Sequence, residues 1–341
     1  MKLKCLLFVW GIFCLSFSEV KAQYLASGLG TIKAQNVIRC GTNLSMNAFT
    51  KKNTQGNYEG IDPTICSILS LAIFGTPDNY EMLHIDADKA DKAISSGKID
   101  VMLGNSYITA SKEIDGYTVP AATIYHDRLV MLAKTDKKPT SMLDLQNENV
   151  CIVPKSPDIE NFEEYLRKYN LSLRTIKFAN FQSAKASLLM NRCKLLVGDE
   201  TTLSAIRDEL KSRKDIFLLP EEIDSHPIYI LVSKNNADLQ SIVKWVINAL
   251  IMAEENDITS KNIAIMTGEN NLSLRNLLGT NPQIWKKLGL QSNWVKKAIK
   301  LYGNYGEIYE KNLGSKSPLK LPREKSNLIK DGGVFKSQAF L

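Results

Sequence analysis

The sequence predicts an α/β protein of two similar lobes, joined by a hinge of two crossing strands and followed by a helical C-terminal extension. Short β-rich runs alternate with helical patterns, which is typical of α/β units with largely parallel sheets. The same order of elements occurs twice along the chain. Two β-rich stretches without a helix signal, 125–134 and 226–234, connect the two passages.

The N-terminal segment, residues 1–22, is predicted to be a secretory signal peptide rather than part of the fold. Lys2 and Lys4 precede an apolar run from Cys5 to Phe17, and we expect cleavage after Ala22. The run is shorter than the roughly 20 apolar residues that a membrane-spanning helix needs. We therefore expect a soluble exported protein, with the bacterial periplasm as its compartment.

The charge balance is moderately basic. The 341-residue chain has a formal net charge of +7, and because the signal holds three lysines and one glutamate, +5 remains after its removal. Part of the excess lies in residues 313–341, which we interpret as a basic, solvated C-terminal tail. Aromatic residues are not interleaved with these basic residues as a nucleic-acid patch would require, so we expect no nucleic-acid partner.

Four cysteines remain once the signal is removed: Cys40, Cys66, Cys151 and Cys193. An even number in an exported chain suggests two disulfides. Three pairings are possible, and the gap between residues 66 and 151 favours Cys40–Cys66 and Cys151–Cys193, one in each half. The chain has no C-x-x-C pair and its three histidines are isolated, so we expect no metal site and no cofactor.

The first passage, assigned to lobe 1 over residues 36–127, begins with the strand "NVIRCGTN". After a turn, we expect Asp62 to cap a helix that has Pro63 at its first position and ends at Gly75. A strand near "EMLHI", a short helix in "DKADKAISSG" and the strand "KIDVMLG" complete the passage.

The second passage, assigned to lobe 2 over residues 128–226, repeats this order. It contains the strands "NVCIVP", "RTIKFA" and "CKLLVGD" and the helices "FEEYLRKYN" and "FQSAKASLLMNR". Residues 227–312 are expected to return to lobe 1 and to form the C-terminal helices. An apolar stripe runs through "DLQSIVKWVINALIMAEEN", and shorter helices are expected around Trp285, Trp294, Tyr302 and Tyr309.

Ligands of open α/β sheets bind outside the carboxyl ends of the strands. This rule selects four loops, residues 42–49, 104–112, 154–160 and 198–202. Their mixture of charged, hydroxyl and amide side chains suits a small zwitterion, with Lys112 for a carboxylate and Asp199 for an ammonium. Simpler interpretations stay open, because Lys112 fits an exposed first helical turn and Asp199 fits the N-cap of the next helix.

The chain resembles the periplasmic solute-binding proteins of polar amino-acid ABC transporters, bacterial solute-binding protein family 3, and especially their general L-amino-acid branch. The resemblance extends from about Val37 to the C-terminus. It rests on "GIDPTICSILSLAIFG", "SSGKIDVM", "VCIVP", "NRCKLLVGDE", "INALIMAEENDIT" and "GNYGEIYEKNLGSKSPLKL". The four mature cysteines also occupy the positions of that branch. The resemblance implies the type II periplasmic-binding-protein fold, in which two α/β lobes close on an amino acid.

The resemblance also implies roles for single residues. The family's acidic group for the α-ammonium corresponds to Asp199, and its acidic or amide residue after the first strand corresponds to Asn43. The arginine that holds the α-carboxylate corresponds to Lys112, which keeps the charge but loses the planar two-pronged hydrogen bond. The branch also tends to have an arginine at the position of Gly104.

The second-lobe loop departs most from the family pattern. A Gly-Thr-Thr type turn is replaced by Lys155, Ser156 and Pro157, and proline offers neither an N–H nor a hydroxyl. Met46 and Tyr107 are expected to shape the side-chain pocket. The complete predicted ligand-binding set is Asn43, Met46, Asn105, Tyr107, Thr109, Lys112, Ser156 and Asp199.

These features predict a non-enzymatic, monomeric receptor that captures an L-amino acid between its lobes and delivers it to an inner-membrane ABC permease. Two alternatives remain. The altered "KSPDIE" loop is compatible with a sensing homologue that has lost amino-acid transport. A dehydratase-like enzyme on the same fold would need an acid or base, for which Asp158 or Glu160 are candidates.

Overall fold

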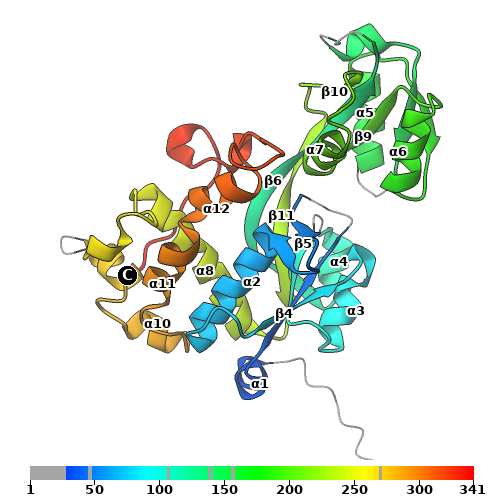
Figure 1. The fold of residues 1–341 in the computed structure, drawn as a ribbon. Helices are drawn as coiled ribbons and strands as arrows, with labels where there is room; N and C mark the ends of the chain where they lie inside the picture. The colour runs from blue at the N-terminus through cyan, green and yellow to red at the C-terminus, as the bar shows by residue number, and fades with distance from the viewer. Residues whose placement is uncertain are drawn as a thin grey trace, which may run out of the picture.

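The structure is a computed structural model that describes residues 28–44, 48–105, 108–136, 139, 141–154, 158–268 and 271–341. It shows two α/β lobes joined by two long strands (Figure 1). A continuous sheet passes through both lobes in the order β4-β1-β5-β11-β6-β9-β7-β8, with β10 paired to β6. The two-lobed α/β fold predicted from the sequence is therefore confirmed.

The regular elements follow the predicted order. The strands of the sheets are β1 (Ile38–Thr42), β2 (Thr50–Lys52), β3 (Tyr58–Gly60), β4 (Tyr80–His84), β5 (Val101–Asn105), β6 (Thr118–Lys134), β7 (Asn149–Ile152), β8 (Arg174–Lys177), β9 (Leu195–Asp199), β10 (Ile216–Leu218) and β11 (Asp224–Ser233). The helices of the two lobes are α1 (Leu29–Gln35), α2 (Ile61–Phe74), α3 (Ala90–Ser95), α4 (Ala110–Asp115), α5 (Asp158–Lys168), α6 (Phe181–Leu189) and α7 (Glu200–Glu209). The helices that follow β11 are α8 (Ala237–Glu255), α9 (Leu272–Leu277), α10 (Gln283–Lys287), α11 (Trp294–Tyr302) and α12 (Tyr305–Asn312).

Lobe 1 contains β1 between its parallel neighbours β4 and β5, with α2 packed against them. Gly75 ends α2 in the left-handed conformation, with φ of 85°, as the sequence predicts. The start of α2 differs from the prediction. Gly60, not Asp62, is the N-cap residue, and Asp62 lies within the first turn with its side chain fully buried. That burial gives Asp62 a different role, described below.

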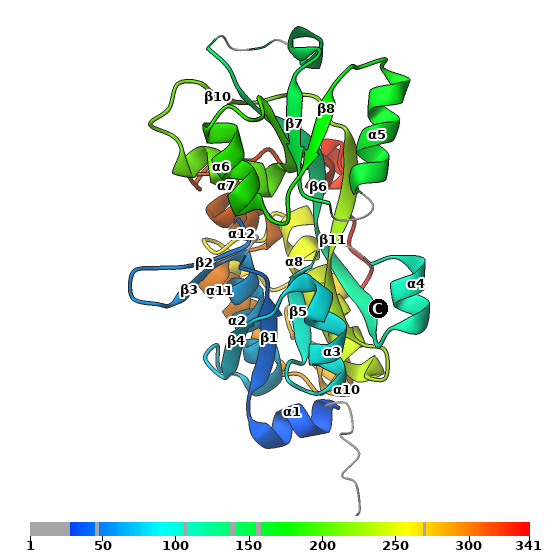
Figure 2. The ribbon, with the colours of Figure 1, turned by 90° about the vertical axis from the view of Figure 1, so that its right-hand side faces the viewer.

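Lobe 2 contains the parallel strands β8, β7 and β9, with helices on both sides (Figure 2). One face of its sheet packs against Phe162 of α5, and the other packs against Leu188 of α6 and Leu203 of α7. Lobe 2 thus has a hydrophobic core of its own, separate from the core that β1 shares with α2 and α8.

The two disulfides are those that the cysteine spacing favours. Cys40 of β1 is bonded to Cys66 of α2, and Cys151 of β7 is bonded to Cys193, just before β9. Each bond therefore ties a central strand to a neighbouring segment of the same lobe, and neither disulfide crosses between the lobes.

The hinge consists of β6 and β11, which pair antiparallel from Thr118 opposite Ser233 to Leu129 opposite Asp224. Beyond Leu129, β6 continues into lobe 2, where it pairs with β9 and β10. Two strands thus cross between the lobes, as predicted. The exact lobe limits at residues 128 and 226 remain a proposal, because both strands belong to the sheet of each lobe.

The helices after β11 pack against lobe 1. The predicted apolar stripe of α8 is buried throughout, and Trp285 and Trp294 meet edge to face with their ring centroids 5.2 Å apart. Within the part of the chain that the structure describes, none of the helices has the length and apolarity needed to cross a membrane.

The prediction of a solvated tail over residues 313–341 is wrong. Phe335 and Phe340 are buried in the lobe 1 core, and Phe340 lies between Trp245 and Trp285. Other buried residues of this segment are Leu313, Leu319, Leu321 and Leu328. The lysines alternate with these apolar residues, so the segment exposes its charges while its apolar side chains fill grooves between the helices.

Candidate functional site

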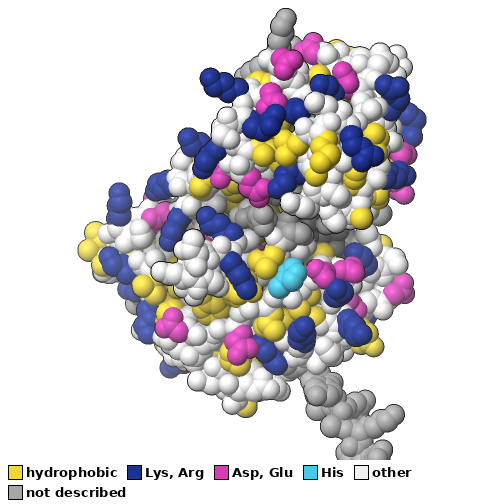
Figure 3. Space-filling model, turned by 45° about the vertical axis from the view of Figure 1, so that its right-hand side comes forward, with side chains coloured by type: hydrophobic (Ala, Val, Ile, Leu, Met, Phe, Trp, Pro, Cys, Tyr) yellow, Lys and Arg dark blue, Asp and Glu magenta, His cyan; other side chains and the backbone are white. Residues whose placement is uncertain are grey.

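The lobe 1 half of the candidate site lies where β1 and β5 end side by side. Thr42 is the last residue of β1, and Asn43 follows it in a buried position. The space-filling view shows that the surface is indented between the two lobes, with acidic and basic side chains on both sides (Figure 3). Figure 2 shows β1 running from α1 toward lobe 2, and β5 is parallel to it, so the carboxyl ends of both strands point toward lobe 2, where ligands of such sheets bind.

Asp62 is the buried carboxylate at this edge. The hydroxyl oxygens of Thr42 and Thr50 lie 2.6 Å and 2.9 Å from its Oδ2 atom. Its Oδ1 atom has no hydrogen-bond partner among the described residues. Burial raises the pKa of Asp62 to about 6, although the two hydroxyl hydrogen bonds lower it in part. Asp62 therefore offers an unsatisfied acceptor beside the ends of β1 and β5.

The same carboxylate leaves no room for a side chain at Gly104. Its φ of 59° lies in the left-handed region, and a Cβ atom there would be 2.8 Å from Oδ2 of Asp62. The general L-amino-acid branch tends to have an arginine at this position. In this protein an arginine would fit only if both the backbone and Asp62 moved. Gly104 consequently leaves Asp62 without a cationic neighbour on this strand.

Asp62→Asn is expected to remove a pH dependence of stability. An acid whose folded pKa is raised stabilises the folded state most at low pH and loses that contribution as pH rises through the folded value. A shift from 3.8 to about 6 corresponds to about 3 kcal/mol in total, of which the parent loses about 2.4 kcal/mol between pH 4 and pH 7. The stability difference, variant minus parent, should therefore grow by about 2.4 kcal/mol over this range in urea titrations.

The matched control for this prediction is Asp88→Asn, because Asp88 is exposed on lobe 1. Its stability difference from the parent should not change with pH. A stability difference for Asp62→Asn that is the same at pH 4 and pH 7 would mean that Asp62 does not hold its proton in the folded state.

The lobe 2 half of the candidate site is centred on Asp199, the last residue of β9. It occupies the N-cap position of α7 but makes no capping hydrogen bond with its side chain, so the helix start does not account for the carboxylate. Its Oδ1 atom lies 3.4 Å from Nε2 of His226 on β11, and both side chains are largely buried. This position places a carboxylate at the end of a lobe 2 strand, next to the hinge.

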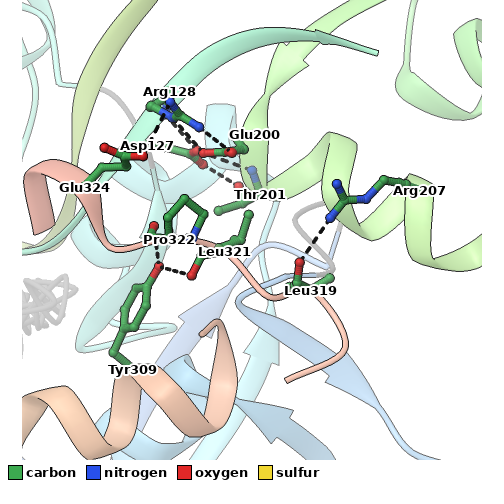
Figure 4. Close-up of polar contacts among 10 residues, drawn as sticks. All are labelled: Asp127, Arg128, Glu200, Thr201, Arg207, Tyr309, Leu319, Leu321, Pro322 and Glu324. Carbon is green, nitrogen blue, oxygen red and sulfur yellow. Dashed lines mark hydrogen bonds and ion pairs between the residues drawn. The ribbon is translucent and has the colours of Figure 1, made fainter. Parts of the chain in front are cut away.

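A polar network behind Asp199 fixes the start of α7 to the hinge (Figure 4). The backbone N–H of Arg128 donates to Oδ1 of Asp127 at 2.9 Å, and the Thr201 hydroxyl donates to its Oδ2. The Arg128 guanidinium grips Glu200 with two hydrogen bonds of 2.8 and 2.6 Å. Burial, and then the charge of Asp199, raises the pKa of Asp127 well above its usual range. The charge of Asp199 thus affects the network behind it, in which Arg128 and Glu200 offset each other's charge.

Lys112 lies exposed in the first turn of α4, and its backbone N–H donates to the hydroxyl of the N-cap residue Thr109 at 3.3 Å. Its side chain lines a cavity of about 330 Å³ together with Asp91, Asp115 and other residues of lobe 1. The described residues form no ion pair with Lys112. Its predicted role in holding a carboxylate stays a prediction, because the described contacts are compatible with both interpretations.

The structure does not describe the side chains of four predicted site residues. Met46, Tyr107 and Ser156 lie outside the described residues, and for Asn105 only the backbone, at the end of β5, is described. The structure thus brings Asn43 to the lobe 1 edge and Asp199 to the lobe 2 edge, while the rest of the predicted set stays a prediction.

A separate cavity of about 890 Å³ lies on the flank of the molecule between the lobes. Its walls come from the β2–β3 hairpin, α2, α7 and α12, with Lys51, Glu59, Asp208 and Lys311 among the charged residues. Asn43, Thr109, Lys112 and Asp199, the members of the predicted ligand-binding set whose side chains the structure describes, are not among its lining residues. We place the candidate site at the strand ends, beside Asn43, Asp62 and Asp199, rather than in this cavity.

Sequence reasoning missed Asp62 and the pair Asp127 and Arg128. The helix-start pattern at Asp62 suggested an N-cap, and nothing in the local sequence revealed that the side chain turns toward the threonines of β1 and β2. The signal for Asp127 and Arg128 was present, because two adjacent charges in the β-rich stretch "YHDRLVMLAK" need buried partners.

Three known proteins resemble this chain over most of its length, although no protein-family model matches it. The general L-amino acid-binding periplasmic protein AapJ of Rhizobium johnstonii is 30% identical, covering 91% of both chains. The glutamate/glutamine/aspartate/asparagine-binding protein BztA of Rhodobacter capsulatus is 27% identical, covering 92% of this chain and 94% of BztA. A Brucella ovis ABC transporter periplasmic binding protein with glutathione bound is 30% identical, with a TM-score of 0.83, covering 91% of this chain and 98% of that structure.

The similarity to these relatives includes both lobes, the hinge and the C-terminal helices, because it extends over nine-tenths of the chain. The relatives are named as binding proteins, and the two-lobed fold described above agrees with such an architecture. This chain belongs to the family of periplasmic solute-binding proteins of amino-acid ABC transporters.

Proposed function

We propose that this protein is the periplasmic substrate-binding component of an amino-acid ABC transporter. It takes up an L-amino acid between its lobes and delivers it to an inner-membrane permease. The observation that carries the proposal is Asp199, a carboxylate at the end of β9 that does not cap its helix and that lies beside the hinge. The resemblance to the family supports the same role, because the family's acidic group for the α-ammonium corresponds to Asp199.

The proposed recognition divides the ligand between the lobes. Asp199 and Asn43 hold the α-ammonium, because a carboxylate and an amide oxygen are good acceptors for it. Lys112, Thr109 and Ser156 hold the α-carboxylate. A ligand that contacts both lobes makes more contacts in the closed arrangement than in the open one. The free energy of these additional contacts favours closure, and it couples ligand binding to the hinge motion.

The substrate class extends to one further candidate, a glutathione-like peptide. The Brucella ovis relative is described with glutathione bound, and its similarity to this chain equals that of AapJ in identity. Glutathione carries an α-ammonium and an α-carboxylate on its γ-glutamyl residue, so the same Asp199 and Lys112 pair suits it. We propose that the protein acts after loss of residues 1–22, as a monomer in the periplasm and without catalysing a reaction.

Lys112→Ala is expected to weaken ligand binding by tenfold or more. A charge-assisted hydrogen bond to a carboxylate contributes about 1.5–3 kcal/mol, and every 1.4 kcal/mol is about a factor of ten in Kd. Calorimetric titration of the parent and the variant measures the change. Lys92→Ala on α3 is the matched control and should bind as the parent does. An unchanged Kd for Lys112→Ala would leave Lys112 as a solvated lysine of α4.

The test of the transport function is uptake in cells that encode the protein. Deleting the gene should lower the initial uptake rate of at least one radiolabelled amino acid, or of glutathione, by tenfold or more. Restoring the parent chain should recover uptake, whereas Asp199→Ala, produced at the same level, should not. Uptake of all twenty amino acids and of glutathione at parental rates in the deletion strain would overturn the proposal.

A further inference from the structure

The C-terminal segment, residues 313–341, is anchored firmly to the lobe 1 side of the molecule. Its backbone is held at several points by the helices beneath it. The Tyr309 hydroxyl of α12 donates to the carbonyl of Pro322 at 2.9 Å, and the Asn248 amide of α8 donates to the carbonyl of Gln338 at 2.9 Å. Arg323 forms an ion pair with Glu254 of α8. With its buried apolar side chains, the segment is thus a fixed part of lobe 1.

The same segment also contacts lobe 2 at three points, and Figure 4 shows the two that involve Arg207 and Arg128. Arg207 of α7 donates to the carbonyl of Leu319 at 3.2 Å. Glu324 lies 3.9 Å from the Arg128 guanidinium, where β6 enters lobe 2. Lys325 pairs with Glu222, just before β11, at 2.6 Å. The segment therefore bridges from the helices of lobe 1 to three different parts of lobe 2.

The bridge is also attached to the hinge itself. The hydroxyl of the buried Ser326 accepts a hydrogen bond from the backbone N–H of His126 in β6 at 2.8 Å. This contact lies two residues before Arg128, so the segment follows the hinge strand across the boundary between the lobes. Figure 1 shows the first part of the segment between α12 and α7, near β6, and its end beside the helices of lobe 1.

The two ends of this bridge differ in strength. The lobe 1 end is apolar and buried, and such contacts break only when the segment unfolds. The lobe 2 end is polar and partly exposed: Lys325 and Glu222 keep 46% and 32% of their side-chain surface in contact with solvent. Water can replace such contacts at little cost. The bridge can therefore bias the orientation of lobe 2 and still release it.

The bridge is also connected to the candidate site. The Arg128 guanidinium that approaches Glu324 holds Glu200 by two hydrogen bonds, and Glu200 follows Asp199 directly in the chain. A rotation of lobe 2 that moves Arg128 away from Glu324 thus also moves the start of α7 and its carboxylate.

We propose that residues 313–341 act as a brace across the hinge, which sets the orientation of lobe 2 relative to lobe 1. The brace acts through the pairs Lys325–Glu222 and Glu324–Arg128 and through the Arg207–Leu319 contact. Rotation of the lobes exchanges these contacts for water. The proposal concerns the protein without ligand and does not depend on which ligand it carries.

The experiment measures the distance between the lobes in the full mature chain without ligand. Spin labels at Ser96→Cys in lobe 1 and Thr175→Cys in lobe 2 report the distance distribution by pulsed electron resonance. Both positions are exposed, and the native cysteines are engaged in disulfides. Glu324→Ala combined with Lys325→Ala should broaden or shift the distribution, whereas thermal unfolding stays close to that of the parent.

The control and the rescue make the test specific to the brace. Lys330→Ala removes a cation whose hydrogen bond within the described part of the chain goes to the carbonyl of Glu255 in α8, so it should leave the distribution unchanged. Lys325→Glu should act as the double variant does, and adding Glu222→Lys should restore the parental distribution by re-forming the pair with its charges exchanged. The proposal would be overturned if the double variant and the parent had the same distance distribution. It would also be overturned if adding Glu222→Lys failed to reverse the change that Lys325→Glu causes.

Discussion

Ending the chain after Asn312 is expected to yield a protein that does not fold stably. The truncation removes six large buried side chains, Leu313, Leu319, Leu321, Leu328, Phe335 and Phe340. Burial of each side chain contributes about 1.5–3 kcal/mol to stability. Their sum is therefore comparable to the whole free energy of unfolding of a typical domain, about 5–15 kcal/mol. Loss of the cooperative thermal transition, or an insoluble product, is the expected measurement.

Smaller changes test the same expectation where the truncated chain cannot be purified. Phe340→Ala should lower the free energy of unfolding by about 3–5 kcal/mol, because the ring packs against Trp245 and Trp285 with centroid distances of 5.0 and 5.2 Å. Leu341→Ala, at the adjacent residue with 81% of its surface exposed, should leave stability within about 0.5 kcal/mol of the parent. Equal stability of parent and Phe340→Ala would favour the solvated tail instead.

Asp199→Ala is expected to weaken ligand binding by at least a hundredfold while the fold persists. Removing one partner of a desolvated, hydrogen-bonded charge pair costs about 2–5 kcal/mol, partly because the ligand's ammonium then lies between the lobes without a counter-charge. The carboxylate is mostly buried but does not cap α7, so its loss should affect binding more than stability. Calorimetric titration and thermal unfolding of the same sample separate the two effects.

Two further variants sharpen this prediction. Asp199→Asn keeps the shape but not the charge, and it should lose nearly as much affinity as Asp199→Ala. Glu163→Gln removes an exposed carboxylate of α5 in the same lobe and should bind as the parent does. Parental affinity in Asp199→Asn would assign the ammonium to another group, of which Asp62 is the candidate with an unsatisfied oxygen.

The elements that sequence reasoning predicted well are those whose signals are local. The stripe of α8, the glycine that ends α2 and the alternation of strands with helices all follow from side chains within one segment. The disulfides belong to the same group, because the long gap between Cys66 and Cys151 separates them into two nearby pairs.

The features that it missed depend on contacts between distant segments. Phe340 packs against Trp245 and Trp285, and no pattern within "GGVFKSQAFL" predicts contact with these distant residues. Asp62 is buried because Thr42 and Thr50 approach it from two strands. In the candidate site, sequence reasoning placed Asn43 and Asp199 at strand ends. The buried Oδ1 atom of Asp62, which has no hydrogen-bond partner among the described residues, could be found only from the structure.

The most direct measurement for the central claim is a thermal-shift screen of residues 23–341 against the twenty amino acids, glutathione and small carboxylic acids. A ligand at 100 times its Kd adds about 2.7 kcal/mol of stability, which raises the melting temperature of a protein of this size by roughly 4 °C. We expect such a shift with one or a few amino acids or with glutathione, and its loss in Asp199→Ala. A folded sample that no amino acid and no glutathione stabilises would contradict the assignment of this protein as their receptor.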